Sequence, residues 1–352
     1  MKYGLLVGKG IAFKNTSDGY KNIGDYIQNI AAMQYLPTID DYIDRESLYE
    51  GKEKIKVIMN GWYIGDTSKF PCYNCIIPLP ISMHIVPEIA EELLSNKEVF
   101  NWFKKYEPIG CRDKETERLL ENRGIKAYFS NCLTLTLGKT YKHKSDSEGV
   151  IFVDPYLNKH KDFSKKQLFK IFSNVLFHPV LFLKLKKKFI GKTNVYCTWE
   201  MSRKEFLFNV LQFIEIYKRI IPINKIKNAT FLTHIVKVGN GSSYTTEESK
   251  LEYAKSLLSI YENASCVISS RMHCLLPCIA MKTPVLFCTG KYLNFAATKE
   301  DAGRWGGVNE ILKTIYIDVF KINVIDPVIT DLTKIVEKLD NTCTNFINNK
   351  VE

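Results

Sequence analysis

Short apolar runs rich in β-branched residues alternate with longer amphipathic stretches through most of this chain, in two consecutive series. The first series predicts strands over 3–7, 56–59, 76–77, 109–112 and 127–129. The second series predicts strands over 149–153, 194–198, 229–234, 266–270, 284–288 and 314–317. Strands that alternate with helices pair in parallel through helical crossovers, so the pattern predicts an α/β protein.

Three helices can be placed from their ends. Asn22 is a good N-cap for the apolar helical pattern that follows it, and the acidic Asp25 falls in the first turn. Asp113 caps a second helix, which ends before Gly124. The apolar spacing within 251–261 predicts a third helix, which leads into a strand.

A polar, aperiodic segment, 138–149, separates the two series of strands. The length of 352 residues also suggests two domains of about 150 residues each, with a cleft between them. We therefore expect an N-terminal domain over 1–145, a C-terminal domain over 146–325 and a helical tail over 326–352.

The charge of the chain is concentrated in one segment. The composition, 45% hydrophobic and 25% charged, excludes disordered and fibrous proteins. Of the net charge of +11, residues 159–192 carry +9 through ten Lys and one Asp. Within this segment, 171–183 is uncharged but shorter than the about 20 residues that span a bilayer. The segment either lies on an anionic membrane surface or forms an internal helix pair, separated at Pro179, with Phe172 and Phe177 in the core.

The N-terminus and the cysteines bear on the compartment. The apolar run before Gly8 is too short for the core of a signal peptide, so we expect a cytoplasmic protein, peripheral at the inner membrane face if 159–192 binds lipid. The ten Cys then lie in a reducing compartment and pack as small apolar residues. Cys72 and Cys75 have half of a zinc-ribbon spacing without a second pair, which favours packing over a metal site.

The sharpest chemical signal is the hexapeptide 269–274, which joins the end of a predicted strand to the start of a helix. Strand ends of this kind line the ligand crevice of an open α/β sheet, and helix N-termini attract anions. Arg271 adds a guanidinium suited to phosphate or carboxylate, and His273 can exchange a proton near neutral pH. The alternative is structural, with Arg271 in a salt bridge to the other domain and His273 packed under the helix.

Other polar residues occupy comparable positions. His234 ends a predicted strand, so its imidazole should reach the same crevice. Arg112 closes a strand of the first domain, where its alternative partner is a glutamate of the next helix. Asn22 and Asp25 open their helix, and capping is their commoner role. Asp25 could instead take a proton from a substrate hydroxyl.

Several motifs are missing from the sequence. It contains no P-loop, no glycine-rich dinucleotide fingerprint after the first strand and no serine elbow. Nucleotide hydrolysis, dinucleotide redox chemistry and serine hydrolysis are therefore disfavoured. An Asp-x-Asp pair is also missing, which argues against a divalent-metal nucleotide-sugar site, and we expect neither a metal nor a cofactor.

Eight segments together resemble one family, the polysaccharide pyruvyl transferases. In chain order they are 22–25 (NIGD), 60–62 (NGW), 78–84 (PLPISMH), 109–113 (IGCRD), 128–137 (YFSNCLTLTL), 233–234 (TH), 270–278 (SRMHCLLPC) and 283–287 (TPVLF). The resemblance runs from about 20 to 310. It implies a GT-B-like fold, with two Rossmann-like domains whose parallel sheets face each other across a cleft. It also implies transfer of pyruvate from phosphoenolpyruvate to two hydroxyls of a sugar, forming a cyclic ketal.

The resemblance also implies donor-binding roles for Arg271, His273 and Arg112, whereas the roles given to the other residues are our own expectations. On the phosphoenolpyruvate side, which we expect in the C-terminal domain, the donor-binding residues are Arg271, His273, Ser270 and, from the first domain, Arg112. On the acceptor side, which we expect in the N-terminal domain, they are Asn22, Asp25, Asn60 and Trp62. For catalysis we expect His273 as the proton donor, His234 as its alternative and Asp25 as the second group.

The sequence thus predicts a metal-independent pyruvyltransferase that acts on a sugar of a bacterial surface-polysaccharide precursor, with phosphoenolpyruvate as co-substrate, a lipid-linked acceptor and no nucleic-acid partner. A GT-B glycosyltransferase with a nucleotide-sugar donor is the alternative. A third hypothesis is a non-enzymatic protein that binds anionic membrane or nucleic acid through 159–192.

Overall fold

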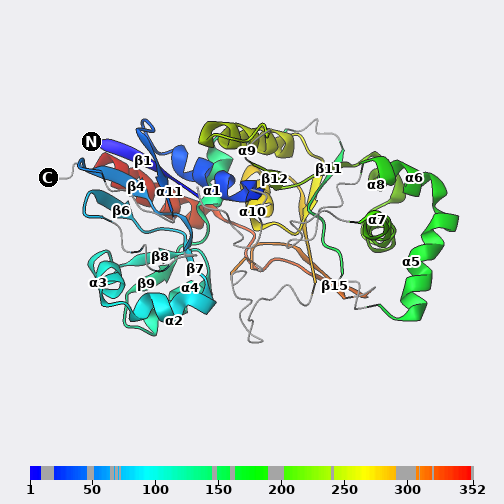
Figure 1. Cartoon of the computed structure of the whole chain (residues 1–352), viewed down its shortest axis with the longest axis horizontal. Helices are drawn as coiled ribbons and strands as arrows, with labels where there is room; N and C mark the ends of the chain where they lie inside the picture. The colour runs from blue at the N-terminus through cyan, green and yellow to red at the C-terminus, as the bar shows by residue number, and fades with distance from the viewer. Residues whose placement is uncertain are drawn as a thin grey trace.

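The computed structural model describes residues 1–8, 20–45, 51–63, 67, 70, 73–144, 149–158, 163–188, 202–238, 242–290, 307–308, 310–318 and 321–349. Parallel sheets with helices packed around them make up most of this part of the chain (Figure 1). The prediction of an α/β protein is confirmed.

The first half of the chain forms two four-stranded parallel sheets, with the orders β3-β1-β4-β6 and β5-β7-β8-β9. Strands β4 and β6 pair in the first sheet, and β5 and β7 pair in the second. Only two residues separate β4 from β5 and three separate β6 from β7, so each of these two chain segments continues from one sheet into the other. The strands are β1 (Lys2–Val7), β3 (Asp41–Asp44), β4 (Ile55–Ile58), β5 (Gly61–Tyr63), β6 (Ile76–Leu79), β7 (Met83–Ile85), β8 (Ile109–Cys111) and β9 (Ala127–Phe129).

The second half forms a six-stranded sheet in the order β11-β10-β13-β14-β15-β16, parallel except for the pairing of β16 with β15. Its strands are β10 (Val150–Val153), β11 (Thr230–Leu232), β13 (Cys266–Ser269), β14 (Val285–Thr289), β15 (Thr314–Asp318) and β16 (Lys321–Ile325). Strand β10 lies between β11 and β13, so the chain adds later strands on both sides of β10 and the strand order reverses there. Strand β1 has the equivalent position in the first sheet, between β3 and β4. Open α/β sheets bind ligands beyond the carboxyl ends of strands at such reversal points.

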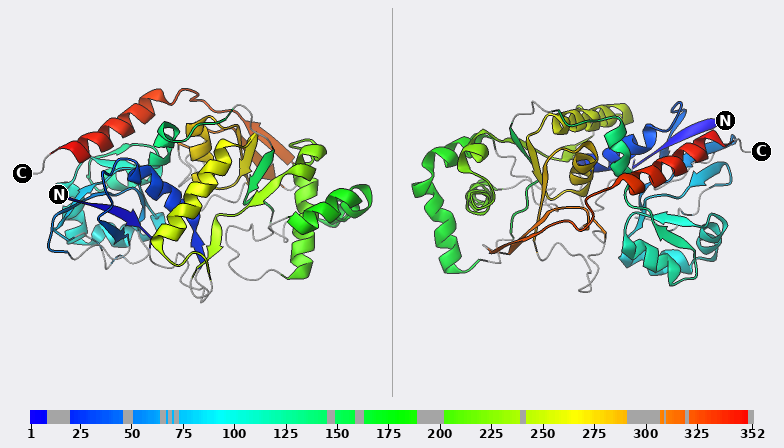
Figure 2. Two further views of the ribbon diagram at one scale, coloured as in Figure 1. Left: turned by 90° about the horizontal axis from the view of Figure 1, so that it is seen from above. Right: turned by 180° about the vertical axis from the view of Figure 1, so that it is seen from behind.

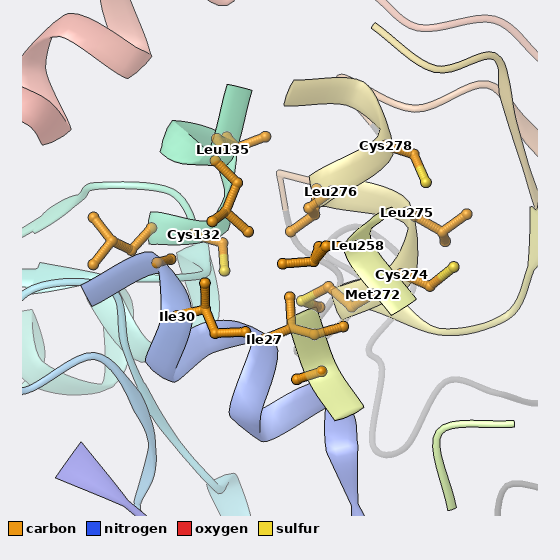
Figure 3. Packing of buried hydrophobic residues seen from close by; sticks show 14 of the residues in the cluster. Ile27, Ile30, Cys132, Leu135, Leu258, Met272, Cys274, Leu275, Leu276 and Cys278 are labelled. Atoms are coloured by element: carbon orange, nitrogen blue, oxygen red, sulfur yellow. The ribbon is translucent and has the colours of Figure 1, made fainter. Parts of the chain in front are cut away.

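Helices from both halves share one hydrophobic core. Ile27 and Ile30 of α1 pack in it with Leu135 of η2, Leu258 of α9 and Leu276 of α10 (Figure 3). These positions are buried because apolar residues repeat at helical spacing on the facing sides. The helices are α1 (Ile23–Met33), α2 (Pro87–Ser95), α3 (Lys97–Lys105), α4 (Lys114–Glu121), η2 (Leu133–Lys139), α5 (Lys165–Phe177), α6 (Pro179–Lys188), α7 (Arg203–Tyr217), α8 (Ile223–Asn228), α9 (Glu247–Glu262), α10 (Met272–Met281) and α11 (Thr333–Asn348).

Two further connections join the halves. Strand β2 (Tyr20–Asn22) pairs antiparallel with β12 (Ile235–Lys237), immediately before α1 begins. Helix α11 returns from the second half to the first (Figure 2). There the buried Lys56 Nζ donates to three carbonyls at the end of α11, at 2.6 to 3.0 Å. A lysine at a helix C-terminus also interacts favourably with the helix dipole, so Lys56 ties this helix to the first half.

The helix starts inferred from capping residues are confirmed, whereas α4 ends at Glu121 rather than directly before Gly124. Asn22 is the N-cap of α1 and its Oδ1 accepts from the Gly24 N–H at 3.1 Å. Asp113 is the N-cap of α4 and accepts from the Thr116 N–H at 2.9 Å. Gly124, just past α4, has a φ of 72°, which suits a residue without a Cβ.

The structure corrects other predicted boundaries. Strand β11 ends at Leu232, so His234 does not end a strand but lies in the short connection between β11 and β12. The predicted separation of a helix pair at Pro179 is instead confirmed, because the apolar run 171–183 belongs to two helices bent by 97°, the second of which begins at Pro179. The predicted strand 194–198 lies outside the described residues. The GT-B arrangement of two domains stays a prediction.

Candidate active site

The carboxyl ends of β10 and β13 meet at the reversal point of the six-stranded sheet. Val153, the last residue of β10, pairs with Ser269, the last residue of β13. The next residues are Asp154 on one strand and Ser270 with Arg271 on the other. The topology therefore brings an acid and an arginine together where a ligand of this sheet is expected.

Asp154 holds the guanidinium of Arg271. Arg271 is the N-cap residue of α10, and its Nε donates to Asp154 Oδ2 at 2.8 Å. The same oxygen accepts from the backbone N–H of His234 at 3.0 Å. Asp154 is fully buried and Arg271 is 8% exposed. Both residues of this salt bridge belong to the second half of the chain. The alternative role considered for Arg271, a salt bridge to the other domain, is therefore not observed.

The backbone at Asp154 is held in an unusual conformation. Its φ is 43°, in the left-handed region, where residues other than glycine are strained and are concentrated at functional sites. The Ser270 hydroxyl donates to the Asp154 carbonyl at 2.7 Å, and the Asp154 N–H donates to the Leu232 carbonyl at 3.2 Å. Ser270 thus holds the backbone of Asp154, the residue whose carboxylate orients Arg271, and the Ser270 hydroxyl proton is already donated.

Three buried polar atoms of this network have no hydrogen-bond partner among the described residues: Asp154 Oδ1, His234 Nδ1 and Arg271 Nη2. Buried polar atoms are nearly always paired, so a group of three in one network points to a polar ligand. Arg271 Nη2 is a charged donor beside the N-terminus of α10, and both features favour a phosphate or carboxylate oxygen.

His234 is buried next to this network. Its Nε2 lies 2.7 Å from the hydroxyl of Tyr261, which is also buried. Burial lowers the pKa of His234 to about 4; the Asp154 carboxylate opposes this shift and the Arg271 guanidinium adds to it. The imidazole is therefore neutral at physiological pH.

The first turn of α1 lies against both candidate histidines. The Ile23 N–H donates to the His234 carbonyl at 2.7 Å. A Cβ on Gly24 would lie 3.1 Å from His234 Nδ1 and 3.3 Å from the Cβ of His273, the second residue of α10. The absence of a side chain at Gly24 therefore allows the N-terminus of α1, from the first half, to approach the second-half network.

A looser polar cluster follows on the same helix. Gln28 is buried; its Nε2 lies 3.4 Å from Asp25 Oδ1 and its Oε1 lies 3.4 Å from Arg112 Nη1. Asp25 Oδ2 is 3.9 Å from Arg45 Nη1. These contacts place Asp25 and Arg112, both inferred from the sequence, on one side of α1. Arg112 contacts Gln28 and Asp113 rather than the glutamates that were its alternative partners.

The expected acceptor residues lie around this cluster. Asn60 is buried, and its Nδ2 donates to the Gln28 carbonyl at 2.8 Å, whereas its Oδ1 has no partner among the described residues. Trp62 packs under Arg45, with the guanidinium carbon 4.7 Å from the ring centre. Asn22 acts as the helix cap, its commoner role. Among the residues that the structure describes, no hydrogen bond joins Asn60 or Trp62 to the second half.

Arg112 lies next to a buried acid–histidine pair. Asp113 Oδ2 is 2.6 Å from His84 Nδ1 and 3.9 Å from Arg112 Nε. Burial alone would raise the pKa of Asp113, but the His84 charge and hydrogen bond, with Arg112, lower it overall. The carboxylate therefore stays ionised and attracts the Arg112 guanidinium without a short hydrogen bond to it.

Sequence reasoning missed three charged residues of this region. Asp154 directly follows a predicted strand, so the strand-end rule applied to His234 would have found it. Arg45 follows β3, a strand that was not predicted. Lys21 precedes the α1 cap and donates to the Gly8 carbonyl at 2.7 Å. Burial, then the nearby Lys250 ammonium, lowers the pKa of Lys21 to about 8.

Within the described ranges, no group of three or more His, Cys, Asp and Glu side chains could hold a metal ion. A search of curated proteins found none that matches the sequence. The model of the polysaccharide pyruvyl transferase family matches residues 22–292, which include every site residue predicted from the sequence. This match covers most of the chain, and it includes the reversal point of the six-stranded sheet but begins after β1. The chain therefore belongs to the polysaccharide pyruvyl transferase family.

Proposed function

We propose that the protein transfers pyruvate from phosphoenolpyruvate to two hydroxyls of a sugar in a bacterial surface-polysaccharide precursor, forming a cyclic ketal. The observation that carries this proposal is the Arg271–Asp154 pair at the N-terminus of α10, with Arg271 Nη2 still available to an anion. Phosphoenolpyruvate presents a carboxylate and a phosphate close together, and a fixed guanidinium suits either group.

The two halves divide the substrates in this proposal. Arg271, His273 and the Ser270 backbone bind the donor on the second-half side, with Arg112 reaching it from the first half. Asn22, Asp25, Asn60 and Trp62 contact the sugar. Support for this division comes from α1, whose first turn touches His234 while its second turn, through Gln28, contacts Asn60 and Arg112.

The chemistry requires one protonation of carbon and two attacks by hydroxyls. Protonation of the methylene carbon of phosphoenolpyruvate gives a methyl group and a cationic centre at the neighbouring carbon. The first sugar hydroxyl attacks that centre and loses its proton. The carbon–oxygen bond to phosphate then breaks, and the second hydroxyl attacks the same carbon and loses its proton. The products are the ketal and inorganic phosphate, so an acid and a base are both needed.

The structure favours different roles for the two histidines. We assign the proton donor to His273, which is partly exposed at the start of α10. His234 is buried and neutral at physiological pH, so in the free protein it is a poor acid. It orients the site through Tyr261 and the α1 N-terminus. Asp25, with a partly exposed carboxylate beside Arg45, is the proposed base for the attacking hydroxyl.

The test is donor consumption with a panel of acceptors. The protein is incubated with phosphoenolpyruvate and lipid-linked or free sugars, and phosphate release is followed together with the acceptor mass. A pyruvate ketal on the acceptor, with one phosphate released for each ketal, supports the proposal, and Arg271→Ala should abolish both signals. Release of nucleoside diphosphate from nucleotide sugars, with no phosphate from phosphoenolpyruvate, would instead establish the glycosyltransferase alternative. We expect the reaction in the cytoplasm.

A further inference from the structure

Helices α5 and α6 carry an unusual concentration of exposed apolar side chains. We call residues 165–188, which form these two helices, the α5–α6 elbow. Thirteen large hydrophobic side chains are exposed in the described part of the chain, and seven belong to the elbow: Phe169, Phe172, Val175, Leu176, Phe177, Val180 and Leu183. Phe169, Leu176 and Phe177 are each at least 75% exposed. Isolated exposed apolar residues are ordinary, but a contiguous group marks an interaction surface.

The elbow has a separate inner face that packs on the protein. Ile171, Leu181 and Leu185 are buried against the second-half core. The internal-helix alternative would place four apolar side chains of α5 in the core. The structure exposes all four: Phe172, Val175, Leu176 and Phe177. The second apolar face is therefore not explained by packing within the chain.

A buried polar contact fixes the rotation of α5. Asn174 Nδ2 donates to Glu215 Oε2 of α7 at 3.0 Å, and Asn174 Oδ1 accepts from Lys218 Nζ at 2.9 Å. Asn174 and Glu215 are both buried, so turning α5 would leave buried polar groups without partners. The outward direction of Phe169, Phe172 and Leu176, spaced three and four residues apart, is thus held by α7.

The charge of the elbow is entirely positive. It contains seven lysines and no acidic residue, and all seven are exposed: Lys165, Lys166, Lys170, Lys184, Lys186, Lys187 and Lys188. They lie on both sides of the exposed apolar residues in the sequence. Two copies of this surface would repel each other, whereas an anionic surface would attract it.

The shape of the elbow excludes a straight span. Among the described residues no single helix is long and apolar enough to cross a membrane, and α5 with α6 reaches that length and composition only as a pair bent by 97°. The two helices are about 20 and 15 Å long, against an apolar bilayer core of about 30 Å. They also lie at the end of the molecule far from both termini (Figures 1 and 2).

We propose that the α5–α6 elbow docks the protein on an anionic lipid surface, with its exposed apolar side chains at the level of the headgroups and its lysines on lipid phosphates. Apolar burial and attraction to anionic lipid are the two contributions that hold amphipathic helices at an interface. Neither contribution depends on the reaction that the protein catalyses.

The test is flotation of the full chain with vesicles of phosphatidylcholine mixed with phosphatidylglycerol, compared with phosphatidylcholine alone. We expect the protein to float with the anionic vesicles, to remain at the bottom with the neutral ones, and to be released by added salt. Equal recovery with both kinds of vesicle would overturn the proposal.

Two variants separate the contributions. The first variant changes four lysines of α6 to Gln: Lys184, Lys186, Lys187 and Lys188. It should lower the fraction bound to anionic vesicles more than about tenfold, because each lysine near an anionic surface adds separately to the binding free energy. The matched control changes four exposed lysines of the first half, Lys52, Lys54, Lys97 and Lys126, to Gln and should bind like the wild type. If the control loses binding as strongly as the elbow variant, attraction is general and the elbow is not the docking site.

The apolar variant is Phe169, Leu176 and Phe177→Ser, which alters only exposed positions and should leave thermal unfolding unchanged. It should also lose flotation while keeping the turnover of a water-soluble acceptor. Sedimentation velocity provides the competing outcome. A wild-type dimer that this variant disperses, with no flotation by either protein, would show that a second copy covers the elbow and would overturn lipid docking.

Discussion

The two polar clusters at the reversal points differ in how tightly they are assembled. In the second half, Asp154 contacts Arg271 and His234 at 2.8 and 3.0 Å, and all three residues are buried. In the first half, the contacts of Asp25 and Arg112 are 3.4 to 3.9 Å long. Short charge-assisted hydrogen bonds indicate a site formed before the ligand arrives, whereas long ones leave side chains able to move toward it.

This comparison suggests a division of labour. A donor that is always the same small anion can be bound by a fixed second-half network, because preorganised charge need not rearrange during the reaction. A sugar with several hydroxyls requires side chains that can adjust, and the looser first-half cluster provides them. Substitutions in the fixed cluster should therefore change both stability and turnover, and those in the loose cluster mainly substrate affinity.

The largest combined effect on stability and turnover is expected from Asp154→Asn. The substitution keeps the size of the side chain but removes the charge that pairs with the buried Arg271. Breaking a buried pair in this way costs about 3 to 5 kcal/mol in the free energy of unfolding, and the misplaced guanidinium should lower turnover by about 10²-fold or more. Urea unfolding and phosphate release measure the two effects. The control is Asp326→Asn, at an exposed surface pair. Turnover near that of the wild type would contradict a fixed donor site.

Arg271→Lys tests whether geometry or charge matters at the same position. An ammonium keeps the charge but cannot donate to Asp154 and an anion from one planar fork. We expect kcat/KM for phosphoenolpyruvate to fall by about 10²-fold, with less loss of stability than Asp154→Asn causes. In Arg271→Ala, kcat/KM for phosphoenolpyruvate should fall further than in Arg271→Lys. Arg219→Lys, in a second-half ion pair with Glu215, is the matched control. Full activity of Arg271→Lys would show that only charge is needed.

Arg112→Ala tests the looser cluster. The closest hydrogen-bond partner of Arg112 is the neutral Gln28, 3.4 Å away. The substitution should therefore lower the free energy of unfolding less than Asp154→Asn does. We expect KM for phosphoenolpyruvate to rise by about tenfold, because one charged contact of several is lost. Steady-state kinetics measure it, with Arg118→Ala on the exposed side of α4 as the control. An effect as large as that of Arg271→Ala would remove the distinction between the two clusters.

Part of this site could be read from the sequence, because strand ends and helix caps are local. The Asn22 and Asp113 caps and the position of Arg271 at the start of a helix follow from neighbouring residues alone. The role of Asp154 depends on β10 lying between β11 and β13, which is a long-range pairing. Gln28 joins Arg112 to Asp25 only through the fold, and no local pattern predicts that contact.

The elbow shows a second limit of sequence reasoning. Amphipathicity alone did not decide whether Phe172 and Leu176 belong to a core or to a surface, since both alternatives require the same spacing. The outcome depends on which face of α5 carries Asn174, and on a partner acid, Glu215, forty-one residues away on α7. The short strands β2 and β12 were missed for the same reason, because each has only three residues and is formed by its pairing.

The smallest effect at neutral pH is expected from the stability contribution of His234. Its pKa is lowered to about 4 in the folded protein, against an ordinary value of 6.5, because burial disfavours the charged imidazole. Between these two values the unfolded chain binds a proton that the folded protein does not. The free energy of unfolding should therefore be unaffected above pH 6.5 and fall as the pH is lowered toward 4, by about 3 kcal/mol in all.

His234→Gln removes the titrating group while keeping a polar side chain that can hydrogen-bond to Tyr261. The variant should lose this acid-dependent fall, so that its stability relative to the wild type improves steadily between pH 6.5 and 4. Urea unfolding at several pH values measures both slopes. Equal slopes for the wild type and His234→Gln would mean that His234 becomes protonated in the folded protein. It would then compete with His273 as the acid, and the second-half cluster would be less rigid than its short contacts indicate.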